Sequence, residues 1–108
     1  MAYIYNMEFV EGSAFHRWNL RTLSDDDFRE LQNALALRPD RGVLIPGGGG
    51  LRKIRWSVKG KGKRGGARII YYWVVVRHAI VLLLGYEKGR KADLSPAELR
   101  LLRNALTE

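Results

Sequence analysis

The fold of this chain is decided by residues 51–87, which read LRKIRWSVKGKGKRGGARIIYYWVVVRHAIVLLLGYE. The first eight of these residues alternate in the two-residue period of a strand, with Lys53, Arg55 and Ser57 on one side and Arg52, Ile54, Trp56 and Val58 on the other. Residues 67–75 and 80–86 are apolar, β-branched and aromatic, which predicts two central strands joined near Arg77 and His78. Residues 59–66 (KGKGKRGG) predict a basic hairpin loop. The segment therefore predicts three consecutive strands.

Two helices are expected before this segment. Residues 3–10 are aromatic and β-branched, which favours an opening strand, and residues 11–20 predict a short helix with Phe15 and Trp18 on one side. Ser24 is a suitable N-cap for a second helix, which should end before Pro39. Residues 41–50 contain four consecutive glycines and are expected to form a flexible loop.

The end of the chain predicts a third helix. Ser95, Pro96 and Glu98 supply an N-cap, a first-turn proline and a capping-box acid, and leucines then recur at helical spacing. The fold class expected is α+β: one domain over residues 1–108, with a small, mostly antiparallel four-stranded sheet, two N-terminal helices and a C-terminal helix.

Composition narrows the functional classes. The 108 residues are 46% hydrophobic and 28% charged, which is typical of a folded domain. Cysteine is absent, so no disulfide framework is possible and a cytoplasmic location is expected. The longest apolar run, residues 69–76, is far below the roughly 20 residues that span a bilayer, so no membrane association is expected.

Positive charge is concentrated in one part of the chain. The net charge is +8, and residues 51–91 hold twelve Lys or Arg against one acidic residue, Glu87. A surface of one sign usually binds a polyanion, so nucleic acid is the first candidate partner; a basic domain with no such partner is the alternative.

Several kinds of site are excluded by their motifs. The glycine-rich segments lack the spacing of a P-loop or a dinucleotide fingerprint. His16 and His78 are far apart with no third ligand at a familiar spacing, so neither a metal site nor a cofactor is expected. No serine lies in a nucleophile elbow, and the acids needed for glycoside hydrolysis lie mainly in the first turn of a helix.

A cluster of basic residues remains. Lys53 and Arg55 lie on the same face of one strand, and Arg68 begins the neighbouring strand across the hairpin, so the three can converge on one phosphate. Lys88 follows the last strand and can complete the group. Tyr72 and Tyr86 could stack on unpaired bases or could serve only in packing. The cations of the hairpin loop are interpreted as a solvated segment that attracts the phosphate backbone.

The segments LRKIR, KGKGKRGG, ARIIYYW and GYEKGRKADLS together resemble the RelE/ParE toxin superfamily, and most closely its HigB-like branch. The resemblance covers nearly the whole chain. It implies a toxin of a type II toxin-antitoxin system, a ribosome-dependent messenger RNA interferase that inhibits translation. It also implies a cognate antitoxin as partner, of the helix-turn-helix HigA-like kind.

The resemblance also implies site residues. The paired basic residues of the family's second strand match Lys53 and Arg55, and the arginine that begins the third strand matches Arg68. Lys88 stands near the family's basic residue after the fourth strand. These four are the expected catalytic residues of a metal-independent endoribonuclease, with Lys53 as base because neighbouring cations disfavour its charged form. The residues expected to bind RNA are Arg52, Lys59, Lys61, Lys63, Arg64, Tyr72, Tyr86, Arg90 and Lys91.

Two other functions remain open. ParE relatives share the fold and inhibit DNA gyrase without cleaving RNA, although they generally lack the clustered basic residues. The third possibility is an RNA-binding module without catalysis, because fold alone does not decide function.

Overall fold

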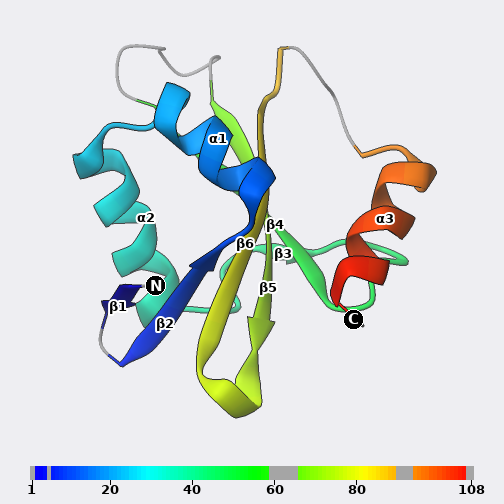
Figure 1. The fold of residues 1–108 in the computed structure, drawn as a ribbon, viewed down its shortest axis with the longest axis horizontal. Coiled ribbons are helices and arrows are strands. Elements are labelled where there is room, and N and C mark those ends of the chain that lie inside the picture. Colours follow the sequence, from blue (N-terminus) through cyan, green and yellow to red (C-terminus); the bar gives the residue numbers. More distant parts are fainter. Residues whose placement is uncertain (1, 5, 59–65, 90–93, 107–108) are drawn as a thin grey trace.

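The computed structural model describes residues 2–4, 6–58, 66–89 and 94–106. A single twisted sheet runs through the molecule, with helices on both faces (Figure 1). The strand order is β1-β2-β6-β5-β4-β3, and every neighbouring pair is antiparallel except β2 and β6, which are parallel. The predicted α+β class and mostly antiparallel sheet are therefore confirmed.

The three central strands follow the predicted segment closely. β4 spans Leu51–Trp56, β5 spans Ala67–Val74 and β6 spans Ala79–Glu87. A short 3-10 turn, η1 (Val75–Arg77), joins β5 to β6, and His78 completes the turn in the left-handed conformation. Strand β5 is buried over most of its length, as expected for the centre of a sheet covered on both faces.

The predicted count of four strands is wrong, because two short strands extend the sheet at its edges. The opening segment forms a hairpin of β1 (Ala2–Ile4) and β2 (Met7–Glu11), since Asn6 adopts a positive φ of 66° and reverses the chain. Residues 41–50 are not wholly a loop either. They contain β3 (Val43–Leu44), and the glycine turn after it brings the chain back to pair with β4.

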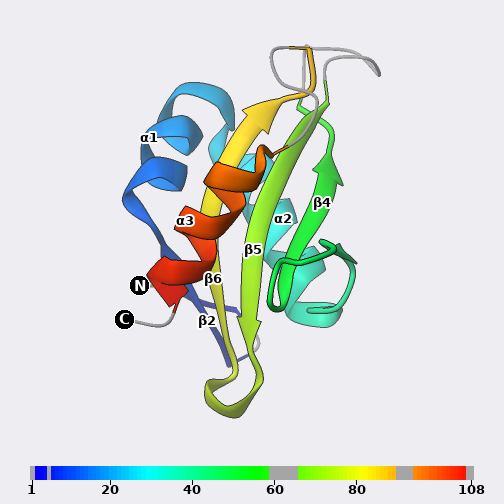
Figure 2. The same ribbon diagram turned by 90° about the vertical axis from the view of Figure 1, so that its right-hand side faces the viewer.

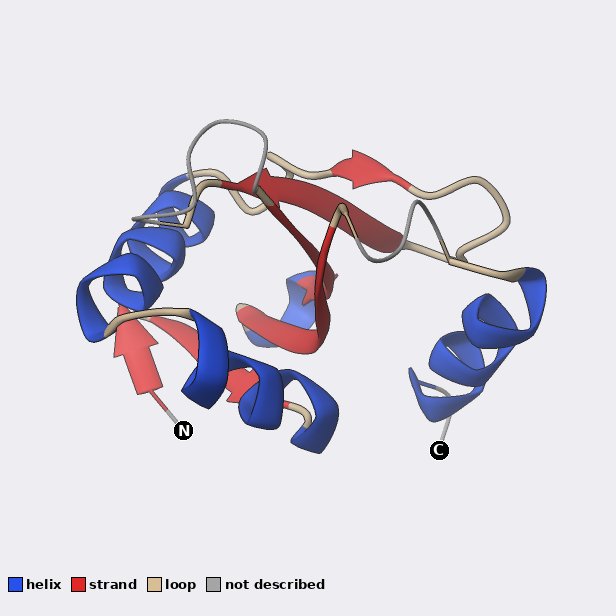
Figure 3. Ribbon diagram, turned by 90° about the horizontal axis from the view of Figure 1, so that it is seen from above, coloured by secondary structure: helices blue, strands red, loops and turns tan. Residues whose placement is uncertain are grey.

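Helices α1 (Ser13–Thr22) and α2 (Asp25–Leu37) cover one face of the sheet (Figure 3). The first begins and ends two residues later than predicted, and it buries Phe15 and Trp18 as expected. Gly85 of β6 lies directly beneath Trp18, where a β-carbon would fall 2.1 Å from the indole ring. The side chain of Ser24 caps α2 by accepting a hydrogen bond of 3.0 Å from the Asp27 amide. Phe15 and Trp18 of α1 and Leu31 and Leu35 of α2 pack on the sheet in the larger hydrophobic core.

Helix α3 (Pro96–Leu106) lies on the opposite face, in front of β5 and β6 (Figure 2), and is the one helix there in the described part of the chain. The predicted capping box is confirmed, because Ser95 and Glu98 each accept a hydrogen bond from the other's backbone amide. The predicted leucine stripe packs on the sheet and forms a smaller core with Leu51, Ile70 and Tyr72. The part of this face beyond the smaller core carries the basic residues of the candidate site.

Candidate nucleic-acid site

Three side chains lie in one row across β4, β5 and β6. Arg55 is directly opposite Arg68, and Arg68 is directly opposite Tyr86. Alternation along β5 places Arg68 on the same face as Ile70, which packs in the smaller core beside α3. The two arginines predicted to converge are therefore brought together by strand register.

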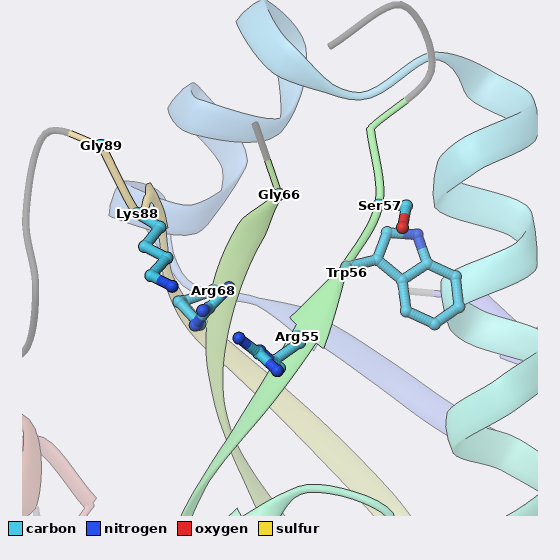
Figure 4. Close-up of a pocket in the computed structure, with 7 residues that line it drawn as sticks. All are labelled: Arg55, Trp56, Ser57, Gly66, Arg68, Lys88 and Gly89. Carbon is cyan, nitrogen blue, oxygen red and sulfur yellow. The ribbon is translucent and has the colours of Figure 1, made fainter. Parts of the chain in front are cut away.

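Lys88 and Gly66 lie next to this row, where β6 ends and β5 begins. The amide of Lys88 donates a hydrogen bond of 3.3 Å to the carbonyl of Gly66, which joins the end of β6 to the start of β5. In Figure 4 the end of the Lys88 side chain points toward Arg68, and Arg68 and Arg55 lie beside each other. Together with neighbouring residues, these three cations line one open cavity of about 650 Å³; its lining is Arg55, Trp56, Ser57, Gly66, Arg68, Lys88 and Gly89.

Arg68 is the most enclosed of the three cations. It is only 8% exposed, and its Nη1 donates a hydrogen bond of 3.3 Å to the carbonyl of Ala67. Within the described part of the chain, no carboxylate forms an ion pair with Arg55, Arg68 or Lys88. Since a buried guanidinium is costly unless its charge is compensated, this arrangement favours an anion in the cavity.

Lys53 shares this face but does not line the cavity. Lys53 is opposite Ile70 on β5 and opposite Val43 on β3. It lies two residues before Arg55 along β4, on the side of Arg55 that is away from Lys88. Two residues along a strand correspond to about 7 Å. The structure therefore places Lys53 next to the cavity, within the length of an extended lysine side chain.

Arg52 lies on the other face of β4 and is held by the loop before β3. Its Nη1 donates hydrogen bonds of 3.1 Å to the carbonyl of Asp40 and 2.8 Å to the carbonyl of Gly42. The structure thus gives Arg52 a local structural contact and does not bring it to the cavity.

The two tyrosines have different environments. Tyr86 is 7% exposed and packs in the smaller core, so little of its ring is accessible to a base. Tyr72 is half-buried and lines a second cavity of about 200 Å³ beneath α3. The remaining residues predicted to bind RNA lie outside the described residues: Lys59, Lys61, Lys63, Arg64, Arg90 and Lys91.

Sequence reasoning missed Ser57 as a cavity residue. The signal for it is its place two residues after Arg55, which puts Ser57 on the same face of the sheet. Trp56 also lines the cavity, although its ring projects to the other side of the sheet, toward α2 (Figure 4). The guanidinium of Arg41 lies 5.6 Å from the centre of that ring.

Neither histidine lines the basic cavity. His16 lies 3.2 Å from a carboxylate oxygen of Glu11, and His78 occupies the β5–β6 turn. Among the residues that the structure describes, no three His, Asp or Glu side chains are grouped to hold a metal ion. In the same part of the chain, every helix is too short or too polar to span a bilayer.

Comparison with known protein families identifies the family of this chain. Residues 9–108 match the family described as RelE toxin of RelE / RelB toxin-antitoxin system. The match covers all of the cavity residues and both helical layers. Because it extends over far more than half of the sequence, the chain belongs to the RelE toxin family, whose members pair with an antitoxin.

Proposed function

We propose that this toxin is a metal-independent endoribonuclease that cleaves messenger RNA on the ribosome. One observation carries the proposal: three cations from three adjoining strand segments line a single cavity, with no carboxylate paired to them in the described residues. A phosphodiester is the anion that matches such a cluster, since guanidinium groups bind phosphate oxygens with two parallel hydrogen bonds.

Cleavage begins with attack by a ribose 2′-hydroxyl on the adjacent phosphorus. The bond from O2′ to phosphorus forms as the bond from phosphorus to O5′ breaks, leaving a 2′,3′-cyclic phosphate and a free 5′-hydroxyl. The 2′-hydroxyl proton passes to a base, and the leaving O5′ takes a proton from an acid. The reaction therefore needs a base, an acid and a group that stabilises the phosphorane charge.

Arg68 is assigned the role of stabilising the negative charge of the phosphorane. Its burial and its hydrogen bond to Ala67 limit its movement, so its remaining N–H groups are oriented before substrate arrives. In many enzymes, donors that are oriented in advance supply most of the stabilisation of the transition state. Arg55 faces it across the strand pair and binds a second oxygen of the same phosphate.

Lys53 and Lys88 are assigned to proton transfer. They approach the arginine pair from opposite ends, because Lys53 lies one row before Arg55 and Lys88 lies beside Gly66, at the end of the sheet. Opposite positions suit an in-line displacement, in which the attacking and leaving oxygens lie on opposite sides of phosphorus. Lys53 acts as the base and Lys88 as the acid.

The partners follow from the same proposal. The ribosome presents the messenger RNA, and the cognate antitoxin is a HigA-like helix-turn-helix protein. Both expectations rest on the resemblance to the RelE/ParE superfamily. Lys59, Lys61 and Lys63, which lie outside the described residues, add attraction for the phosphate backbone.

The test is primer extension on messenger RNA in a purified translation system. The native chain should produce defined cleavage ends, and Arg68→Ala should lower the cleavage rate about 10²- to 10³-fold. Arg77→Ala is the matched control: Arg77 is an exposed arginine in the turn at the opposite end of β5 (Figure 1), and its loss should leave the rate within about twofold. Equal rates for native protein and folded Arg68→Ala would refute the assignment.

The same samples distinguish the two alternatives. A ParE-like toxin would inhibit DNA gyrase in a supercoiling assay and leave the messenger RNA intact. An RNA-binding module would retain binding, with its affinity reduced in Arg68→Ala, and produce no new RNA ends. Either result would replace the nuclease proposal.

A further inference from the structure

The second cavity lies on the same face of the sheet as the basic cluster, between α3 and the glycine turn that follows β3. It has a volume of about 200 Å³ and is lined by Gly48, Gly49, Tyr72, Arg103, Asn104 and Leu106. The nuclease proposal makes no use of it. Its lining combines an aromatic ring, a guanidinium, an amide and backbone.

The cavity depends on the glycine turn. Gly49 has a φ of +64°, and a β-carbon there would lie 3.2 Å from Nε of Arg103. Gly50 has a φ of +106°, and its β-carbon would lie 2.8 Å from the Tyr72 ring. Any other residue would therefore be strained at these positions and would crowd the two side chains. Gly49 and Gly50 therefore let the turn lie close against the guanidinium and the ring.

The second cavity is aligned with the first along β5. Arg68 and Tyr72 are four residues apart on one face of the strand, which corresponds to about 13 Å. Stacked single strands rise about 3.4 Å per nucleotide, so about four nucleotides span this distance, and fewer do so when extended. One RNA strand can reach both cavities.

We propose that this second cavity binds an unpaired base of the same RNA strand whose phosphate lies at Arg68. Tyr72 offers the exposed part of its ring for stacking, and Asn104 offers an amide that can both donate to and accept from a base edge. Arg103 binds the flanking phosphate or an acceptor on the base, and no carboxylate pairs with it among the described residues. The volume of the cavity, about 200 Å³, suits one flat heterocycle.

This inference rests on the nuclease proposal and adds a base-recognition subsite to it. Stacking of a base on an aromatic ring is tolerant of sequence, whereas an amide distinguishes bases by their hydrogen-bonding edges. The subsite therefore gives the protein a preference for the base about two to four nucleotides from the cleaved bond.

The test compares three uncleavable ligands in low salt: a 2′-O-methyl dinucleotide, a 2′-O-methyl pentanucleotide and the same pentanucleotide with all bases removed. The intact and abasic pentanucleotides carry equal charge, so the ratio of their dissociation constants isolates the contribution of the bases. In the native protein this ratio should be about tenfold. In Arg103→Ala/Asn104→Ala it should fall below about twofold, with the dinucleotide affinity unchanged.

Arg100→Ala is the matched control, because Arg100 is an exposed arginine of α3 that does not line the cavity. It should keep the native ratio. All variants are checked by thermal melting, and alanine at these exposed helical positions favours the helix.

The outcomes distinguish failure of the base subsite from failure of the nuclease proposal. If the native protein does not bind the dinucleotide, the first cavity is not a phosphate site and the nuclease proposal fails. If the dinucleotide binds but the base ratio is the same in the double variant as in the native protein, the base subsite is refuted and the nuclease proposal stands. If Arg100→Ala lowers the ratio of dissociation constants as much as the double variant does, the loss follows from the positive charge of α3 in general. That result would also refute the subsite. If the cavity binds a peptide of the antitoxin and not a base, the double variant should keep the same ratio of dissociation constants as the native protein.

Discussion

Arg55 and Arg68 lie directly opposite each other on β4 and β5, facing the side of the sheet that α3 partly covers. Like charges in this relationship normally destabilise a pair of strands. Here one of the two guanidinium groups is also buried, and the described residues provide no acid between them. A protein keeps such a pair where an anion binds, because functional sites are often maintained at the expense of stability.

The first prediction concerns stability at Arg68. Arg68→Leu should raise the melting temperature in phosphate-free buffer, because it removes a buried cation that faces Arg55 and retains apolar contacts with neighbouring strands. Inorganic phosphate should raise the melting temperature of the native protein and have little effect on the variant. A native melting temperature that is insensitive to phosphate would contradict the anion site.

The second prediction concerns salt. Neutralising one phosphate of a single strand contributes a slope of about −0.7 to the plot of log affinity against log salt concentration. Three cavity cations that contact phosphates predict a slope of roughly −2. Arg68→Ala should make the slope less negative by about 0.7, whereas Arg77→Ala should leave it unchanged. Titration of an uncleavable oligoribonucleotide at four salt concentrations measures this, and an equal slope in both variants would argue against contact at Arg68.

The third prediction concerns the packing of α1 on β6. A β-carbon at Gly85 would lie 2.1 to 2.5 Å from three atoms of the Trp18 ring, so Gly85→Ala should lower the free energy of unfolding by about 3 kcal/mol. Gly89→Ala is the control, because a β-carbon there meets nothing within 4 Å, and its effect should stay within about 0.5 kcal/mol. Urea denaturation measures both values. Equal stability of the two variants would show that the ring does not pack on Gly85.

The fourth prediction concerns Tyr71 and alkaline pH. Burial raises the pKa of the Tyr71 hydroxyl above its ordinary value of 10.0, although the hydrogen bond from Gly42 and the nearby Arg52 oppose that change. The hydroxyl donates to the carbonyl of Pro39 at 2.7 Å and accepts from the amide of Gly42 at 2.8 Å. The unfolded chain therefore loses this proton first as pH rises, and the contribution of Tyr71 to stability, fully present below pH 10.0, is lost above it.

Tyr71→Phe tests this relationship. At neutral pH it should lower the free energy of unfolding by about 1 to 3 kcal/mol, because it leaves the Pro39 carbonyl and Gly42 amide without their partner. Above pH 10.0 its stability should fall less steeply than that of the native protein. Parallel curves between pH 9 and 11 would show that the Tyr71 hydroxyl does not control the alkaline transition.

Local features of the sequence were sufficient for most of the fold. The N-cap of Ser24 and the capping box of Ser95 and Glu98 appear where the sequence predicts them, because these motifs act within one turn of helix. The edge strands were not predicted. Residues 43–44 form a strand because the glycine turn folds them back on residues 52–53 of β4, whereas a run of glycines by itself predicts only a loop.

The sequence by itself determined the order of the three helices and the three central strands. It also determined the face on which Lys53, Arg55 and Arg68 lie, because alternation along a strand has a fixed period of two. Only the tertiary structure decided which of the basic residues meet. Strand register put Arg55 opposite Arg68, the loop before β3 held Arg52 on the other face, and packing in the smaller core buried Tyr86. Register and burial come from contacts between segments far apart in the chain, and no local pattern specifies them.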